Sequence, residues 1–247
     1  MNVTVQLFAS LAQAAGQRSV LIEDLPDATT ADEISAAVFL RFPQLAELRE
    51  SVIVAVNEEY VRGEFPVRAC DDVALIPPVS GGSARDSKRG SADDARFTIT
   101  AEVLDVQGLH DLVLAPAAGA VSLFVGVVRD NNLGRDVDYL EYEAYPPMAV
   151  KKMREIAQEL HERWEITDVA MHHRTGRLEI GEASVAIAVA SPHRKDGLEA
   201  CHYAIDRLKQ IVPVWKKEVW TDGEHWIEGS LTPQDEASPD PDSVEAG

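Results

Sequence analysis

The sequence predicts an α+β protein with two domains joined by a polar linker. Two long stretches contain apolar residues at strand and helix spacings, and between them lies SGGSARDSKRGSADDA at 80–95, which is small, polar and without an apolar period. With 247 residues, of which 45% are hydrophobic and 26% charged, the chain can form two cores of ordinary composition. We expect domains over 1–82 and 96–230, a flexible linker over 83–95 and a disordered acidic tail over 231–247.

The first domain is expected to have the order strand, strand, helix and then several short strands. Residues 2–8 and 19–25 alternate with the strand period, and a short helix closed by a glycine separates them. Thr30 and Glu33 form a capping box at the start of a helix that Pro43 ends. This order is compatible with a ubiquitin-like β-grasp fold.

The second domain alternates strands with amphipathic helices. Asp196 and Glu199 have the spacing of a capping box, and Pro213 stops the helix that follows. Strands are expected over 97–104, 120–130, 137–145, 167–176, 183–191, 214–220 and 224–229, and helices over 108–114, 148–164 and 197–212.

A basic segment stands out in a chain whose formal net charge is -19. Residues 191–217, SPHRKDGLEACHYAIDRLKQIVPVWKK, contain an excess of Lys and Arg and two His. Lys209 follows Leu208 by about 100° around the helix, at the edge of the apolar stripe, and Lys216 follows the break at Pro213. The two lysines can therefore converge on one anion-binding pocket. The alternative is that they are solvated surface lysines.

Other candidate residues lie at the ends of predicted strands. Arg129 ends one strand, and His193 and Arg194 follow another, which is where an α/β domain holds loop residues rigidly. Gly81 and Gly82 end the first domain. They are either a flexible connection before the linker or a tail that lacks β-carbons and can pass through a narrow channel.

Composition excludes several classes of function. The balance of 42 Asp and Glu against 23 Lys and Arg disfavours nucleic acid and anionic membranes as partners. No apolar run approaches the roughly 20 residues of a membrane span, and the start lacks the basic region of a signal peptide, so we expect a cytoplasmic protein. Cys70 and Cys201 have no metal-binding or disulfide spacing, and both are expected in cores.

Both domains carry motifs of one enzyme family. Residues 1–82, ending DDVALIPPVSGG, resemble the small subunit of molybdopterin synthase, a ubiquitin-like sulfur carrier. Residues 97–229 resemble its large, catalytic subunit in LFVGVVRDNNLG, LEYEAYPPMA, HRTGRLEIGEASVAIAVASPHR and DRLKQIVPVWKKE, followed by GEHWIE. The resemblance implies a β-grasp domain joined to an α/β hammerhead-type catalytic domain.

The resemblance also implies a reaction. In this family two sulfurs, each carried as a thiocarboxylate on a carrier's terminal glycine, are transferred to cyclic pyranopterin monophosphate. Carried over to this chain, Lys209 and Lys216 are the functional lysines, and Arg129, His193 and Arg194 are anion-binding residues. The implied partners are a separate adenylating enzyme, a sulfur donor and a second copy of the catalytic domain that supplies part of the pocket. No metal or organic cofactor is implied.

One feature departs from the family. The carbonyl of Gly82 is bonded to Ser83, so a thiocarboxylate cannot form on the intact chain. Either a protease cuts after Gly82, which we favour because the linker is polar and accessible, or a separate carrier supplies sulfur and the fused domain is a binding or scaffold module. A third possibility is a ubiquitin-like modifier precursor that is conjugated through Gly82.

Overall fold

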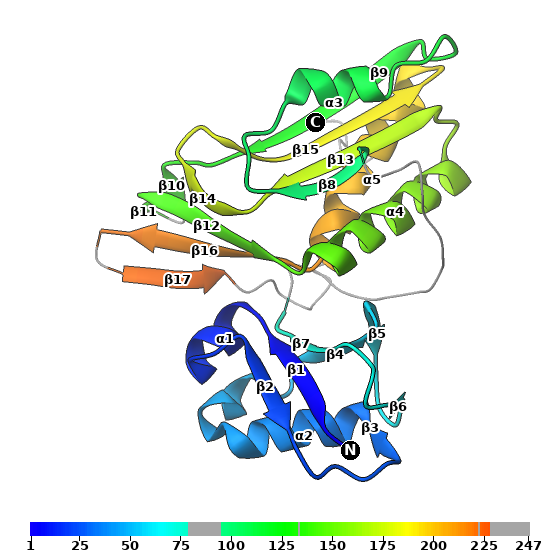
Figure 1. Cartoon of the computed structure of the whole chain (residues 1–247). Coiled ribbons are helices and arrows are strands. Elements are labelled where there is room, and N and C mark those ends of the chain that lie inside the picture. The colour runs from blue at the N-terminus through cyan, green and yellow to red at the C-terminus, as the bar shows by residue number, and fades with distance from the viewer. Residues whose placement is uncertain (79–94, 133, 222, 228–247) are drawn as a thin grey trace, which may run out of the picture.

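Two domains are stacked in the computed structural model, which describes residues 1–78, 95–132, 134–221 and 223–227. Figure 1 shows the N-terminal domain, in blue to cyan, beneath the larger C-terminal domain, in green to orange. The expected tail and most of the expected linker lie outside the described residues. Among the described residues, no helix has the length and apolar character that a membrane span needs.

The N-terminal domain is a β-grasp, as the sequence predicts. Its five-stranded sheet has the order β2-β1-β7-β4-β5, with β1 parallel to β7 at the centre and the other pairs antiparallel. The elements are β1 (Val3–Leu7), α1 (Ala9–Ala15), β2 (Ser19–Ile22), β3 (Thr29–Thr30), α2 (Ala31–Arg41), the 3-10 helix η1 (Pro43–Leu48), β4 (Ile53–Val56), β5 (Glu59–Val61), β6 (Pro66–Val67) and β7 (Val73–Ile76).

Local signals in the sequence set these elements. The capping box at α2 is present, because the Thr30 side chain accepts from the Glu33 amide and the Glu33 carboxylate accepts from the Thr30 amide. Gly16 ends α1 with a φ of 69°, a left-handed conformation that glycine adopts without strain. The expectation that both cysteines lie in cores is wrong for Cys70, which is exposed, and correct for Cys201, which is buried.

The C-terminal domain contains two four-stranded sheets, with orders β14-β12-β16-β17 and β8-β13-β15-β9. The elements are β8 (Phe97–Thr100), α3 (Val106–Leu112), β9 (Ala120–Val127), β10 (Asn131–Asn132), β11 (Arg135–Asp136), β12 (Tyr139–Ala144), α4 (Pro146–Arg163), β13 (Asp168–Arg174), β14 (Gly176–Glu179), β15 (Ala183–Ser191), α5 (Arg194–Ile211), β16 (Val214–Trp220) and β17 (Gly223–Ile227).

Strand β15 shows how the sequence builds the layers of this domain. Val185, Ile187 and Val189 belong to the core that α4 and α5 cover, whereas the alternating alanines, such as Ala186 and Ala188, pack in the core beneath α3. Large side chains on one face and small ones on the other let α3 approach the sheet closely. The sheet therefore has helices on both faces (Figure 1).

The start of α5 differs from the prediction. The helix begins at Arg194, with His193 as its N-cap, so Asp196 lies within the first turn and forms no capping box with Glu199. Packing decides this start, because a β-carbon on Gly197 would lie 2.5 Å from Ser191 Oγ on β15. The glycine lets the first turn of the helix rest directly on the end of the strand.

Candidate functional site

A cavity of about 410 Å³ lies between the two sheets of the C-terminal domain and the C-terminal end of α5. It brings together three of the predicted residues: Arg129, Lys209 and Lys216. Lys209 is in the last turn of α5, Lys216 is on β16, and Arg129 follows β9. The predicted convergence of the two lysines on one pocket is therefore present in the fold.

Lys216 is held by a buried acid. Its Nζ lies 3.0 Å from Oε1 of Glu218, whose exposed fraction is 2%. The same carboxylate accepts two hydrogen bonds from Asn132 Nδ2, at 2.8 and 3.0 Å. By contrast, Lys209 is exposed, and no carboxylate among the described residues forms an ion pair with it. Three cationic side chains thus line a cavity to which one carboxylate contributes, and this balance of charge favours an anionic ligand.

An aromatic pair forms another wall of the cavity. The rings of Tyr142 and His173 meet edge to face with centroids 5.2 Å apart. Because the Arg174 carbonyl oxygen, 2.9 Å from His173 Nδ1, can only accept, Nδ1 carries the proton and Nε2 is left as an acceptor. Burial raises the pKa of Tyr142, with a smaller contribution in the same direction from Glu218, and a hydrogen bond with Ser184 opposes it. Both rings are therefore neutral near pH 7.

Burial of His173 predicts a pH dependence of stability. Its side chain is 5% exposed, and burial lowers its pKa from 6.5 to about 4, against the hydrogen bond to Arg174. Below pH 6.5 the unfolded chain binds a proton that the folded protein excludes, so stability falls as pH drops toward 4. Protonation of this histidine in the unfolded chain should lower the free energy of unfolding by about 2 kcal/mol between pH 7 and pH 5.

Urea unfolding at the two pH values measures this loss. A His173→Gln variant should lack that part of the pH dependence, whereas His202→Gln, which changes an exposed histidine on α5, should retain it. Equal pH dependence in the wild type and His173→Gln would contradict the assignment.

Two predicted residues lie far from this cavity in the same chain. His193 and Arg194 are at the N-terminal end of α5, where they line a separate shallow pocket with Lys195 and Leu198. Fifteen residues of helix separate Arg194 from Lys209, or about 22 Å at the usual rise per residue. One chain alone therefore does not bring these two residues to the lysines.

The N-terminal domain is anchored beside both lysines. Trp215, which precedes Lys216, donates from Nε1 to the Pro77 carbonyl oxygen at 3.1 Å. Tyr60 Oη donates at 3.1 Å to the carbonyl oxygen of Ile211, two residues after Lys209. Successive strand residues point to opposite faces, so Trp215 faces the N-terminal domain and Lys216 faces the cavity. Gly81 and Gly82 lie outside the described residues.

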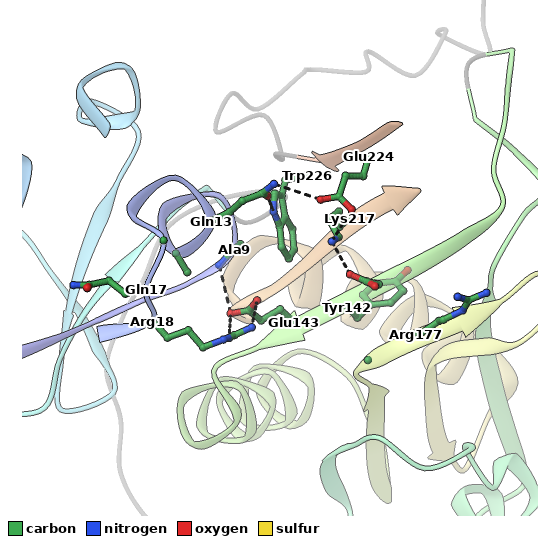
Figure 2. Close-up of a pocket in the computed structure, with 14 residues that line it drawn as sticks. Ala9, Gln13, Gln17, Arg18, Tyr142, Glu143, Arg177, Lys217, Glu224 and Trp226 are labelled. Carbon is green, nitrogen blue, oxygen red and sulfur yellow. Dashed lines mark hydrogen bonds and ion pairs between the residues drawn. The ribbon is translucent and has the colours of Figure 1, made fainter. Parts of the chain in front are cut away.

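A second cavity, of about 620 Å³, lies in the seam between the domains (Figure 2). Its charged side chains pair with one another: Lys217 lies 2.7 Å from Glu141 Oε2 and 3.1 Å from Glu224 Oε2. On the N-terminal side, Gln13 contacts both Glu224 and Trp226. Because these groups satisfy one another, the cavity that contains Lys209 and Lys216 is the stronger candidate for binding an anionic ligand.

Sequence reasoning missed the groups that support the cationic residues. Glu218 follows Lys216 by two positions on a strand, so the two share a face, and this spacing was a signal available in the sequence. Nothing in the sequence marked Tyr142 and His173 as neighbours, because they lie on strands of different sheets.

The fold and the site define a class: a ubiquitin-like domain docked on an α/β domain that has a lysine-lined cavity. Residues 5–82 match the model of the ThiS family, and residues 99–211 match that of the MoaE protein family. The chain belongs to the molybdopterin synthase catalytic subunit family, with a ThiS-family region ahead of the catalytic region in the same chain. It is therefore an enzyme of molybdopterin biosynthesis.

Individual relatives support this assignment. The molybdopterin synthase catalytic subunit of Halalkalibacterium halodurans is 51% identical over 136 residues, which are 55% of this chain and 87% of that protein. The human catalytic subunit is 42% identical over 158 residues, or 62% of this chain and 84% of that protein. The crystal structure of molybdopterin synthase from Staphylococcus aureus matches with 44% identity and a TM-score of 0.52, covering 53% of this chain and 96% of that one.

Proposed function

We propose that this protein transfers sulfur from a glycine thiocarboxylate at the end of its carrier domain, residues 1–82, to cyclic pyranopterin monophosphate, forming the dithiolene of molybdopterin. The observation that carries the proposal is the contact between Pro77 and Trp215. It holds the exit of the carrier domain on the strand that presents Lys216 to the cavity.

Chain length supports this route. Five residues separate Pro77 from Gly82, and an extended chain of five residues spans at most about 17 Å. The cavity is lined by Lys216, the residue next to Trp215, on the opposite face of the strand, and we expect the tail to extend that far. Two glycines at the end of the tail carry no β-carbons, which suits passage through a narrow opening.

The cationic residues have distinct roles in the proposed reaction. Lys209, exposed to the cavity and without an ion-pair partner among the described residues, acts nearest the reacting carbons, in proton transfer or as a transient covalent group. Lys216, which Glu218 positions, stabilises the phosphate or the thiocarboxylate. Arg129, which follows β9 and lines the same cavity, adds a further contact to the anion.

Glu218 is expected to act through Lys216. Glu218→Gln removes the charge that holds the Lys216 ammonium and should lower kcat/KM by about tenfold to a hundredfold. Steady-state kinetics with the pyranopterin measure the change. Glu224→Gln is the matched control, because Glu224 pairs with Lys217 on the other face of the same strand. Equal activity of the two variants would contradict the role of Glu218.

We also propose a homodimer through the C-terminal domain. Strand β9 is at the edge of its sheet, and Leu123, Val125 and Val127 on one of its faces are exposed. Exposed apolar residues on an edge strand are typical of a surface that another protein molecule buries. A second copy would also bring its His193 and Arg194, which are remote from the cavity within one chain, toward the anion site.

The carrier domain needs processing before it can accept sulfur. A protease would cut after Gly82, and an adenylating enzyme with a sulfur donor would then convert the new carboxylate into a thiocarboxylate. The direct experiment is to incubate protein that carries this thiocarboxylate with cyclic pyranopterin monophosphate and to follow the pterin by mass spectrometry. Gain of two sulfurs supports the proposal, and an unchanged pterin contradicts it.

A further inference from the structure

The centre of the surface between the two domains is apolar and therefore says little about which carrier it accepts. Phe8 of the carrier domain stacks on Tyr145 and Trp215 of the catalytic domain, with ring centroids 5.1 and 5.2 Å apart. Ala55, Ala74 and other small carrier residues complete this cluster. Such a surface stabilises docking, whereas charges at its margins fix orientation and partner choice.

On one margin the carrier domain contributes the cation. Arg18, which follows α1, places Nη1 2.7 Å from Glu143 Oε1 and Nη2 3.3 Å from Oε2 of the same carboxylate on β12 (Figure 2). The Ala9 amide also points to this carboxylate, at 3.4 Å. The arginine is 74% exposed and borders the open seam cavity, so salt will screen this pair.

On the other margin the carrier domain contributes the anion. Glu59 on β5 lies 2.6 Å from Lys151 Nζ and 2.8 Å from Lys152 Nζ, both in α4. Lys152 is fully buried, and Glu155 of the same helix shares its ammonium at 2.8 Å. Burial opposes ionisation of Glu59, but the two lysines outweigh it and lower its pKa. This margin is therefore a charge cluster in which Lys152 and Glu155 are buried and Lys151 and Glu59 are partly exposed.

The Lys152 cluster suits a partner that binds and leaves. When Glu59 departs, Lys152 keeps Glu155, so undocking leaves no isolated charge in the catalytic domain. When a carrier with a neutral or basic residue docks there, the buried Lys152 and the partly exposed Lys151 lose their shared counter-ion. The cost of a mismatch is therefore larger at Glu59 than at Arg18.

We propose that these two ion-pair groups, of opposite polarity, form a recognition pattern that selects the carrier. The catalytic domain accepts a β-grasp protein that presents a cation at the position of Arg18 and an anion at that of Glu59. The fused domain fills this surface, so a carrier from another chain must have the same pattern and must displace it. The inference concerns binding; only its consequence for sulfur delivery rests on the proposed function.

The test uses the full chain with a specific protease sequence inserted after Ser83. While the linker is intact, the high effective concentration of the tethered domain hides changes in affinity. After cutting, size-exclusion chromatography over a dilution series at about 0.1 M and 0.5 M salt reports whether the two pieces remain together. The uncut form of each variant, eluting as the uncut wild type does, shows that the variant is folded.

The two margins are expected to respond differently to substitution and to salt. Glu59→Lys should raise the dissociation constant by about thirtyfold or more at both salt concentrations, because it places a third cation beside the buried Lys152 and the partly exposed Lys151. Arg18→Glu should raise it about threefold to tenfold at low salt and less at high salt. Arg18→Glu combined with Glu143→Arg should restore binding to within about threefold. Glu64→Lys, an exposed carrier acid outside both groups, is the control.

Three outcomes would overturn the proposal. These are separation of the cut wild-type pieces at low salt, unchanged affinity in Glu59→Lys, and failure of the Arg18 and Glu143 exchange to recover binding. None of them depends on turnover, so a protein that binds its carrier as described but transfers no sulfur would refute the proposed function and leave this inference intact.

Discussion

Lys209→Ala is expected to lower molybdopterin formation by at least about a hundredfold, the usual contribution of a positioned acid, base or nucleophile. Lys209 lies in the last turn of α5, reaches the cavity and has no ion-pair partner among the described residues, so its loss should leave the fold unaffected. Product formation from thiocarboxylated protein and cyclic pyranopterin monophosphate is the measurement.

The matched control for this change is Gln210→Ala. Gln210 is the next residue of the same helix, is exposed and is not among the residues that line the cavity, and its side chain accepts a hydrogen bond from Arg207 at 3.3 Å. This variant should keep near wild-type activity in the isolated reaction. Full activity of Lys209→Ala would exclude its role in the chemistry and favour the alternative in which the protein is a binding or scaffold module.

Gly82→Ala is expected to lower product formation by about a hundredfold in cells that lack another carrier. The added β-carbon displaces the reacting carbonyl in a narrow channel, and a displacement of about 1 Å is enough for such a loss. Molybdopterin content of the cells is the measurement. Ser83→Ala, on the other side of the proposed cut, should behave as the wild type. Full product formation by Gly82→Ala in these cells would contradict the role of Gly82 as the residue that carries sulfur.

Much of the fold was predictable because its signals are local. The Thr30 capping box, the turn after Gly16 and the alternation of large and small residues along β15 each depend on a few neighbouring residues. The convergence of Lys209 and Lys216 was also predictable, since both flank the break at Pro213. Because the two lysines are close in the sequence, their relative position could be predicted from local structure alone.

Other features depend on contacts between distant segments. Lys152 is on a helix whose charged positions are typical of a solvated face, yet it is fully buried because the carrier domain covers it. Cys70 was expected in a core and is exposed, because β7 begins only after the turn that contains it. The pairing of Tyr142 with His173 requires two sheets to meet. The contacts of Lys152 and of Tyr142 join residues too far apart in the sequence for a local pattern to predict them.

His193 and Arg194 lie far from the two lysines within one chain. Both were predicted as anion-binding residues of the pocket that contains the lysines, but a helix of 18 residues holds its two ends far apart. Within one chain they form a different pocket. Their proposed contribution to the anion site therefore requires a second copy of the protein.

Intact mass spectrometry of the protein from its native cells tests the central claim most directly. The account predicts a fragment that ends at Gly82, with one oxygen replaced by sulfur, and the loss of that replacement in cells without the adenylating enzyme. An uncut chain of 247 residues as the only form in active cells would contradict it, since the carbonyl of Gly82 would then remain bonded to Ser83.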